Sequence, residues 1–390
     1  MSLPTFVVLE GLQDDYDQIQ KMAIGGMAEI FRGRQRSLDR PVAIKRIRPE
    51  IKGNQEILAR FRREARISAA LLHQNLAHVY DYREVAGEAY IIMEYIDGFD
   101  LAQILEKQRQ LPIDVATVVA LKILLGLAQV HAHGMVHRDL KPDNVRISTK
   151  GEVKVMDFGI TYDPAESNLT MPGVLIGSPH YLSPEQIVGA KLDARADLFA
   201  FGISFYEMIT GQKPFMETRD ETVYQVIQKG KYVPIMHLRA DTPPFIANLI
   251  DSCLATQVGR RPNSANRLAV TLQEYATRHF ALAHEARIKQ FLMQTHMLAG
   301  MADMVEVEER TMDPSVTHRI REKWNVWKGA FFAMAAVAAM LAAVNFFPRL
   351  FNMKEVQTVE VDTRSPDSKL APESRTKPSS KAARREKNRR

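Results

Sequence analysis

The feature that most constrains this chain is the run His137-Arg138-Asp139-Leu140-Lys141-Pro142-Asp143-Asn144, which Asp157-Phe158-Gly159 follows at short distance. The two segments supply the carboxylates of Asp139 and Asp157 and the side-chain amide of Asn144. Hard oxygen ligands of this kind suit Mg²⁺. An isolated tripeptide would carry little weight, but a pattern of this length with a second acidic segment at the right spacing is specific.

The run resembles the catalytic loop of protein kinases, and Asp157-Phe158-Gly159 resembles their metal-binding segment. The resemblance implies that Asp139 orients the substrate hydroxyl, while Asn144 and Asp157 hold the Mg²⁺ ions, or Mn²⁺ in their place, that bridge the phosphates of ATP. Lys141 is similar to the lysine that marks Ser/Thr kinases rather than Tyr kinases, and it would contact the γ-phosphate. A solvated loop lysine is the alternative.

Upstream, Pro41-Val42-Ala43-Ile44-Lys45 has the apolar, β-branched character of a buried strand. Its lysine would be costly to bury unpaired, so it requires an anion. In the kinase pattern Lys45 meets the α- and β-phosphates and an acid on the following helix. Glu64 is the candidate, because it is the only acid in residues 60–67. An exposed, ion-paired glutamate is the alternative.

A glycine-containing loop lies between two apolar stretches, as expected where backbone amides approach phosphates. Against the pattern G-x-G-x-x-G, Ala23 and Ala28 occupy the first and third glycine positions, and Gly25 keeps the central one. Gly26-Met27-Ala28-Glu29 resembles the corresponding loop of bacterial Ser/Thr kinases. Further on, a buried strand runs into a connector whose backbone would bind adenine. The residues implied to contact ATP are Ala23, Ile24, Gly25, Gly26, Met27, Ala28, Ile30, Ala43, Lys45, Glu94, Tyr95 and Ile96.

Residues 160–185 are predicted to form an activation loop that closes with Ser183-Pro184-Glu185, similar to the family's A-P-E. Arg138 implies a basic pocket that a phosphorylated loop residue would satisfy, and such a phosphate can order a mobile segment. Thr170 is the first candidate for this autophosphorylation and Ser167 the second. Solvated loop hydroxyls are the alternative.

Other positions resemble structural residues of the kinase core. Ser178 stands where the family usually has a threonine that bonds both Asp139 and Lys141, and it is also a candidate phosphosite. Asp197 is similar to the buried aspartate that braces the catalytic loop, and Arg261 to the arginine that pairs with Glu185. The residues assigned structural roles are His137, Arg138, Glu185, Asp197 and Arg261.

The 390 residues exceed one ordinary domain. The resemblance covers residues 16–280 and implies an α+β, two-lobed kinase fold with a small β-rich N-lobe and a larger α-helical C-lobe, preceded by an N-terminal extension at 1–15. The single cysteine, Cys253, excludes an internal disulfide and agrees with a reducing compartment. We expect it to be a core residue rather than a reactive thiol.

Residues 329–348 are 20 consecutive uncharged residues between Lys328 and Arg349, long enough to span a bilayer as a helix. An alanine-rich buried or oligomerising helix is the alternative. Local positive charge and the need for ATP favour a single-pass protein of the cell membrane with its catalytic domain in the cytoplasm. Residues 281–328 are predicted to be a helical juxtamembrane linker, and 349–390 a disordered basic tail.

The resemblance therefore implies a membrane-anchored Ser/Thr protein kinase that acts on Ser/Thr hydroxyls of protein substrates, its own activation loop included. Phosphorylation in trans would use a homodimer, for which the heptad pattern in the linker is too short to decide. The alternative is a pseudokinase scaffold that binds nucleotide without transfer. It is disfavoured because Lys45, Glu64, Asp139, Asn144 and Asp157 are all present. Nucleic-acid binding is not expected, since the tail lacks aromatic residues for stacking.

Overall fold

The computed structural model describes residues 6–157, 178–280 and 284–298. The predictions for Ser167 and Thr170, and those for the membrane span and the basic tail, fall outside these residues.

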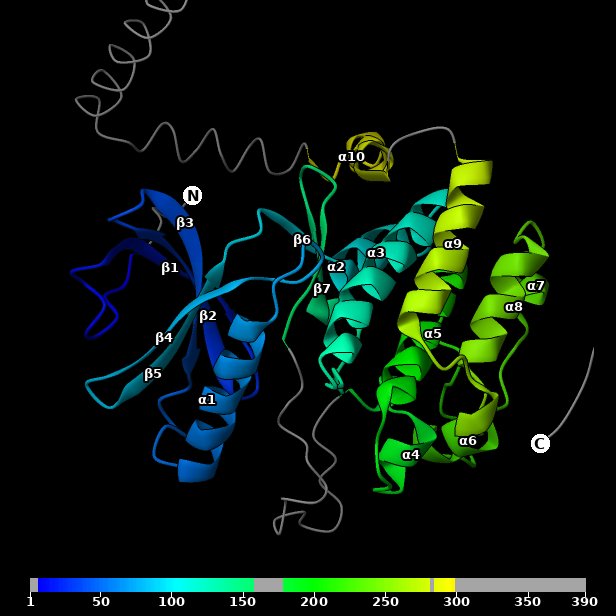
Figure 1. The fold of residues 1–390 in the computed structure, drawn as a ribbon, viewed down its shortest axis with the longest axis horizontal. Coiled ribbons are helices and arrows are strands. Elements are labelled where there is room, and N and C mark those ends of the chain that lie inside the picture. The colour runs from blue at the N-terminus through cyan, green and yellow to red at the C-terminus, as the bar shows by residue number, and fades with distance from the viewer. Residues whose placement is uncertain (1–5, 158–177, 281–283, 299–390) are drawn as a thin grey trace, which may run out of the picture. The chain divides into compact units, whose positions relative to one another are not determined.

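A five-stranded antiparallel sheet forms the first part of the described chain (Figure 1). Its strand order is β1-β2-β3-β5-β4. Side chains along β3 alternate between the two faces of the sheet. Val42 and Ile44 are buried in an apolar cluster on one face, and Ile47 is buried in a second cluster on the other. The strands are β1 Tyr16–Ile24, β2 Ala28–Gln35, β3 Arg40–Ile47, β4 Val79–Val85 and β5 Glu88–Glu94.

One helix, α1 (Gln55–Ala70), packs against this sheet. Asn54 caps its N-terminus, because its side chain accepts hydrogen bonds from the backbone of Glu56 and Ile57. Phe61 and Ala65 lie one turn apart and enter an apolar cluster with strand residues. The same face of the helix therefore carries Glu64 toward the sheet.

Helices make up most of the second part of the described chain (Figure 1). Its core is built around α3 and α5, whose residues are buried on nearly all sides. A small sheet, order β6-β7-β8, lies beside α2 and α3. The helices are α2 Leu101–Gln108, α3 Ile113–Ala132, α4 Pro184–Ile187, α5 Ala194–Thr210, α6 Val223–Lys229, α7 Ile235–Leu238, α8 Pro244–Cys253, α9 Ala265–His279 and α10 His284–Gln294. The short strands and 3₁₀ turns are β6 Gly98–Asp100, η1 Pro142–Asn144, β7 Val145–Ser148, β8 Val153–Val155, η2 Pro179–Tyr181 and η3 Val258–Arg260.

Within the described ranges, α3 is the one helix long and apolar enough to cross a membrane by length and composition. However, 72% of its apolar stretch is buried inside the protein, as in the core helix of a packed domain. Cys253 is also buried, and burial raises the pKa of its thiol to about 12. This agrees with the expectation of an unreactive core residue.

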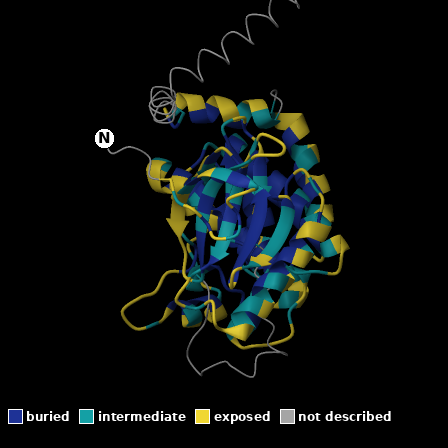
Figure 2. Ribbon diagram, turned by 90° about the vertical axis from the view of Figure 1, so that its left-hand side faces the viewer, coloured by how far each residue is buried: buried dark blue, intermediate teal, exposed yellow. Residues whose placement is uncertain are grey.

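The packed unit extends past both predicted borders of the domain. Before residue 16, Leu9 and Leu12 are buried against the sheet, and the Tyr90 hydroxyl donates a hydrogen bond to the carbonyl of Glu10 (3.0 Å). After residue 280, α10 buries Ile288 and Leu292 in the core of the helical part. The start of the segment predicted as a linker is thus an integral part of that core. Figure 2 shows buried residues concentrated on the inner strands and helices.

Candidate active site

The site begins with Lys45, which lies on β3 in the middle of the sheet. Its Nζ is 2.6 Å from Oε1 of Glu64 on α1 and 2.8 Å from Oδ1 of Asp157, just past β8. Strand register and helix packing therefore bring together three charged residues from distant parts of the sequence. The sequence pattern implied the pair of Lys45 and Glu64, and the contact between Lys45 and Asp157 is added by the structure.

Burial and charge act in opposite directions on this cluster. Burial by itself lowers the pKa of the Lys45 ammonium, but the attraction of Asp157 and Glu64 outweighs it, so the net pKa is raised. Burial raises the pKa of Glu64, and Lys45 opposes this only in part. For Asp157 the balance is reversed, because Lys45 outweighs burial and lowers the pKa. Lys45 is therefore held as a cation that can meet phosphate.

Asp139 and Asn144 are joined within the catalytic loop. The Asn144 side-chain amide donates to the backbone carbonyl of Asp139 (2.7 Å) and to its Oδ2 (2.9 Å). Lys141 Nζ is 3.0 Å from the same Oδ2. Because the Asn144 nitrogen is used in this way, its amide oxygen is oriented away from Asp139 and suits a hard cation.

The backbone of the catalytic loop is held in place by Asp197. This residue lies on α5 and is 1% exposed. Its carboxylate accepts hydrogen bonds from the backbone N–H of His137 (2.7 Å) and of Arg138 (2.8 Å). His131 Nε2 lies 2.7 Å from the same carboxylate. Arg138 has φ of +70° and Asp157 has φ of +50°, conformations that non-glycine residues rarely adopt and that cluster at functional sites.

The glycine-containing loop lies between β1 and β2. Ala23 pairs with Ile30 in the β1–β2 ladder, so the alanine at this position lies within strand β1, directly after a shift of register at Lys21. The loop is closed by a hydrogen bond from the Gly25 N–H to the Ala28 carbonyl (2.8 Å). A methyl group at Gly25 would approach that carbonyl to 3.2 Å, so this tight turn favours glycine at the central position.

The connector after β5 is anchored at both ends. The backbone N–H of Glu94 donates to the carbonyl of His78 (2.8 Å), and Arg146 Nε donates to the carbonyl of Ile96 (2.8 Å). Lys154 forms an ion pair with Glu94 at 2.8 Å. The predicted adenine-binding segment is therefore positioned by His78 and by strands β7 and β8, which follow the catalytic loop.

Glu185 and Arg261 form a bidentate pair far from each other in sequence. Arg261 Nη1 and Nη2 lie 2.6 and 2.8 Å from the two carboxylate oxygens, and both residues are buried. Arg261 also stacks on Phe199, with 4.7 Å from its guanidinium carbon to the ring centroid. In contrast, the described structure contains no hydrogen bond from the Ser178 hydroxyl to Asp139 or Lys141.

The family model for the protein kinase domain matches residues 16–273 of this chain. The chain belongs to the protein kinase family. The predicted two-lobed fold with a β-rich N-lobe and a helical C-lobe is confirmed. A solved structure, the kinase domain of PknI from Mycobacterium tuberculosis, superimposes with a TM-score of 0.54 at 24% identity and covers 70% of this chain and 99% of that domain.

Curated relatives of the kinase domain include three proteins named as serine/threonine-protein kinases, all bacterial. A probable kinase, PknB of Lactococcus lactis, is 36% identical over 64% of this chain and 40% of its own length. PknL of Mycobacterium tuberculosis is 35% identical over 70% of this chain and 66% of its own, and PrkC of Bacillus subtilis is 29% identical over 89% and 55%. The chain thus spans between about two-fifths and two-thirds of these relatives.

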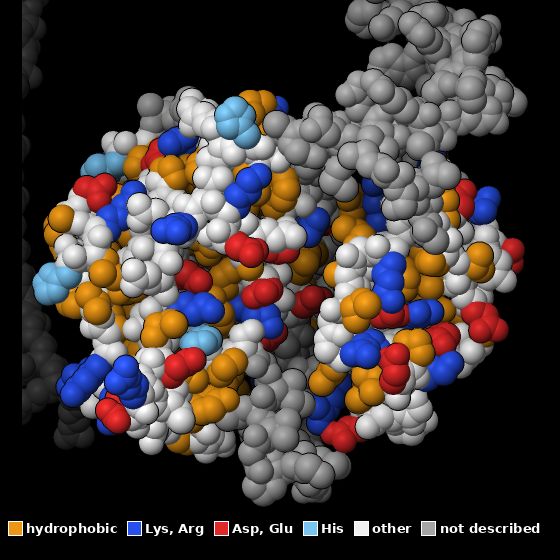
Figure 3. Space-filling model, turned by 180° about the vertical axis from the view of Figure 1, so that it is seen from behind, with side chains coloured by type: hydrophobic (Ala, Val, Ile, Leu, Met, Phe, Trp, Pro, Cys, Tyr) orange, Lys and Arg blue, Asp and Glu red, His pale blue; other side chains and the backbone are white. Residues whose placement is uncertain are grey.

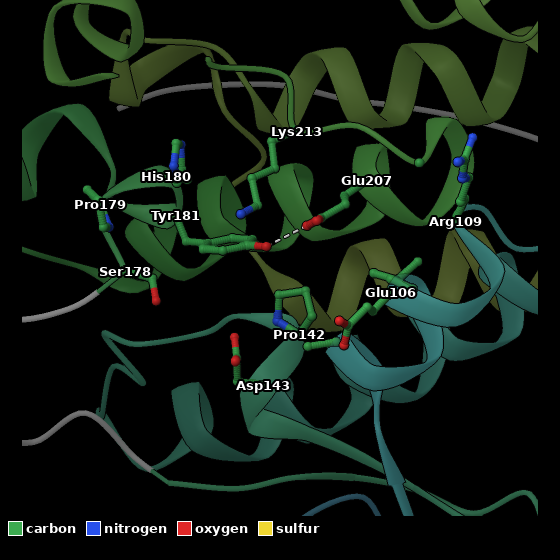
Figure 4. Close-up of a pocket in the computed structure, with 13 residues that line it drawn as sticks. Glu106, Arg109, Pro142, Asp143, Ser178, Pro179, His180, Tyr181, Glu207 and Lys213 are labelled. Atoms are coloured by element: carbon green, nitrogen blue, oxygen red, sulfur yellow. Dashed lines mark hydrogen bonds between the residues drawn. The ribbon is translucent and has the colours of Figure 1, made fainter. Parts of the chain in front are cut away.

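A pocket of about 510 Å³ lies beside the catalytic loop of the kinase domain. Figure 4 shows Asp143 and Glu106 on one side and Glu207 with Tyr181 on the other. The Tyr181 hydroxyl donates to Glu207 (2.5 Å), and burial raises the pKa of the Glu207 carboxyl. The lining residues are Ala102, Leu105, Glu106, Arg109, Pro142, Asp143, Ser178, Pro179, His180, Tyr181, Glu207, Gly211 and Lys213.

Several residues that shape this site were missed by reasoning from sequence. Glu29 is buried and paired with both Lys21 and Arg46, which fixes the strand after the glycine-containing loop. The one feature of the sequence that indicates this pairing is that Glu29 is a lone acid directly after that loop. His131 lies at the end of α3, shortly before the catalytic loop, whereas Glu207 lies on the distant α5. No local pattern distinguishes either residue from an ordinary surface residue.

Proposed function

We propose that the chain is an ATP-dependent protein kinase that transfers the γ-phosphate of Mg-ATP to Ser and Thr hydroxyls. The observation that carries this proposal is Lys45, whose ammonium lies between Glu64 and Asp157 at 2.6 and 2.8 Å. A pseudokinase would be expected to have lost one member of this cluster. The relatives' names support the same activity.

The catalytic loop supplies the acceptor side of the reaction. Asp139 would orient the substrate hydroxyl and take its proton as the hydroxyl oxygen bonds to the γ-phosphorus and the bond to the β-phosphate oxygen breaks. Lys141, 3.0 Å from Asp139, stands where it would neutralise charge on the transferred group. Asn144 restrains Asp139 through two hydrogen bonds, so the carboxylate is pre-oriented before substrate arrives.

The side-chain oxygens of Asn144 and Asp157 fit a divalent cation whose remaining ligands come from phosphate. One amide oxygen and one carboxylate are hard ligands, and Mg²⁺ is usually held by few protein oxygens together with substrate phosphates. Among the described residues there is no cluster of three or more His, Cys, Asp or Glu side chains that could hold a metal alone. A bound divalent cation would supply positive charge against the phosphates of ATP. Mn²⁺ could replace it.

ATP would lie between the glycine-containing loop and the connector. The N–H of Glu94 and the carbonyl of Ile96 are already bonded within the protein. We therefore assign the adenine contacts to the opposite backbone groups, the Glu94 carbonyl and the Ile96 N–H. Ala23 lies in strand β1 and does not exclude phosphate approach at Gly25.

The acceptor class follows from Lys141 and the loop around it. We expect phosphate on Ser and Thr but not on Tyr of a peptide that offers all three. The measurement is phosphoamino-acid analysis after incubation with labelled Mg-ATP, with the Asp157→Asn variant as the inactive control. Phosphotyrosine as the main product would contradict the assignment.

The pocket beside the catalytic loop suits a basic side chain of the protein substrate. Its lining includes three carboxylates, those of Glu106, Asp143 and Glu207, which a substrate residue near the acceptor hydroxyl could reach. Two basic residues, Arg109 and Lys213, also line it. Figure 3 shows that acidic and basic side chains are otherwise interspersed over one face of the domain. The concentration of carboxylates next to Asp139 therefore favours arginine-containing substrates.

Glu207→Gln is expected to raise KM for a peptide with arginine near the acceptor by about tenfold, as expected when a hydrogen bond to a charged group is weakened. The kcat should change little, because Glu207 does not contact the reacting atoms. The matched measurement uses the same peptide with alanine in place of arginine, for which native and variant should not differ. An equal rise in KM for both peptides would contradict this role.

Regulation and location are proposed on sequence grounds alone. Thr170 and then Ser167 are the candidates for autophosphorylation, in trans within a homodimer, and residues 329–348 for a span of the cell membrane with the kinase domain in the cytoplasm. The alignment with PrkC covers 89% of the chain and so extends past the kinase domain. A chain without residues 329–390 that still sediments with membranes would disprove the anchor.

A further inference from the structure

The N-terminal end of α10 contacts the turn that joins β7 to β8. The kinase family model ends at residue 273, so α10 lies outside it. Figure 1 shows α10 beside the tip of the green hairpin that begins with β7. Gly151, in the turn, has φ of +90°, and a methyl group on it would lie 2.2 Å from the backbone carbonyl oxygen of Glu285. The two segments are therefore in direct backbone contact.

Side chains fix α10 in this place from two directions. Ile288, Phe291 and Leu292 are buried in the core of the C-lobe. On α3, Lys122 is 8% exposed, and its Nζ lies 2.5 Å from Oε1 of Glu285. The hydrogen bond from Lys122 lowers the pKa of the Glu285 carboxyl and so favours its carboxylate form.

A second ion pair, between Arg287 of α10 and Asp114 of α3, is formed at partly buried positions. Apolar packing and two ion pairs leave the first turn of α10 little freedom to slide along α3.

The hairpin that α10 contacts carries both candidate metal ligands. Asn144 immediately precedes β7, and Asp157 follows β8 by two residues. Its open end is closed by a hydrogen bond from the Met156 N–H to the Asn144 carbonyl (2.8 Å). The strands are only four and three residues long. Strands this short cannot take up a displacement of the turn at Gly151 by bending. Such a displacement would therefore move Asn144 and Asp157.

We propose that the first turn of α10, through the backbone of Glu285, positions the β7–β8 turn and so holds Asn144 and Asp157 at the separation required for the metal ion. Gly151, Glu285 and Lys122 act here as positioning residues, because none of them is among the residues assigned to ATP, the metal ion or the substrate. The inference rests on the metal-binding roles given to Asn144 and Asp157 in the proposed function. It makes a segment beyond the family's common domain part of the catalytic apparatus.

The test compares two glycine-to-alanine variants of the full chain. Gly151→Ala meets the Glu285 carbonyl, whereas Gly87→Ala, in the β4–β5 turn, has φ of +75° and meets nothing within 4 Å. Both variants strain the backbone and should lower the unfolding temperature, Gly151→Ala by more because its methyl group also meets the Glu285 carbonyl. Only Gly151→Ala should weaken binding of Mn²⁺, by about tenfold, the lower end of the loss on removing an outer-shell partner of a metal site.

Mn²⁺ binding is measured by the electron paramagnetic resonance of free Mn²⁺, in the presence of a non-hydrolysable ATP analogue. The Mg²⁺ concentration for half-maximal transfer should rise in parallel. Equal Mn²⁺ affinity in Gly151→Ala and Gly87→Ala would overturn the inference. Asn144→Ala is measured beside them, and unchanged Mn²⁺ affinity in that variant would instead refute the proposed metal role.

A charge exchange provides a second test that avoids the turn. Arg287→Asp should loosen α10 by repulsion from Asp114 and weaken Mn²⁺ binding, and adding Asp114→Arg should restore it, because the ion pair is re-formed with reversed charges. Weak binding that the second change does not restore, or binding that neither change affects, would contradict a role for α10 in positioning the metal ligands.

Discussion

The Asp139→Asn variant is expected to transfer phosphate about 10²- to 10⁴-fold more slowly than the native chain, the range that a positioned general base contributes. Asparagine keeps the shape of the side chain but cannot take the proton of the acceptor hydroxyl. ATP affinity should be nearly unchanged, because the Lys45 cluster does not involve Asp139. Transfer rate and nucleotide affinity are measured on the same preparation.

The control for this variant is Asp220→Asn, the same chemical change at an exposed position before α6. It should leave both transfer and ATP affinity at native levels. If Asp139→Asn transferred phosphate as fast as Asp220→Asn, the role given to Asp139 would be wrong.

The second large effect is expected from the buried pair of Glu185 and Arg261. Glu185→Gln leaves the guanidinium of Arg261, whose side chain is fully buried, without its carboxylate partner. Loss of one partner of a buried ion pair costs about 3–5 kcal/mol of unfolding free energy. Carbonyl groups such as that of Ala255, 2.7 Å from Arg261 Nε, remain and limit the loss to this range. Urea unfolding followed by circular dichroism measures it.

The matched change for this pair is Glu274→Gln, which breaks an ion pair with Arg278 on the exposed face of α9. Surface pairs at this spacing contribute about 0.3–0.5 kcal/mol, so the unfolding curve should hardly move. Equal destabilisation by the two substitutions would show that the Glu185–Arg261 pair does not hold the C-lobe together.

The pair of Lys45 and Glu64 could be predicted from sequence, because the two residues lie on consecutive elements, β3 and α1. A lysine in an apolar strand needs an anion, and the following helix offers one acid at a core-facing position. The structure supports that reasoning with a Lys45–Glu64 distance of 2.6 Å. The alanine at position 23 departs from the glycine pattern, and its place in a strand ladder explains why the departure is tolerated.

Other parts of the site depend on contacts that no local pattern reveals. His131 meets Asp197 only because α3 and α5 pack together, and the spacing of the two residues in sequence gives no hint of it. The apolar positions Ile288, Phe291 and Leu292 do show helical spacing, but the surface they cover is formed by distant segments. The sequence therefore predicts residues 281–328 as a helical linker, without the contacts that α10 makes with the C-lobe. Ser178 did not form its predicted bonds, and it lines the pocket beside Asp143 instead.

The most direct test of the central claim is transfer of labelled γ-phosphate by the full chain, measured beside binding of Mg-ATP, for the native protein and for Asp157→Asn. The account predicts transfer by the native protein only, dependent on the divalent cation and lost on chelation. Binding of Mg-ATP by the native protein without any transfer would contradict it and would establish a nucleotide-binding scaffold instead.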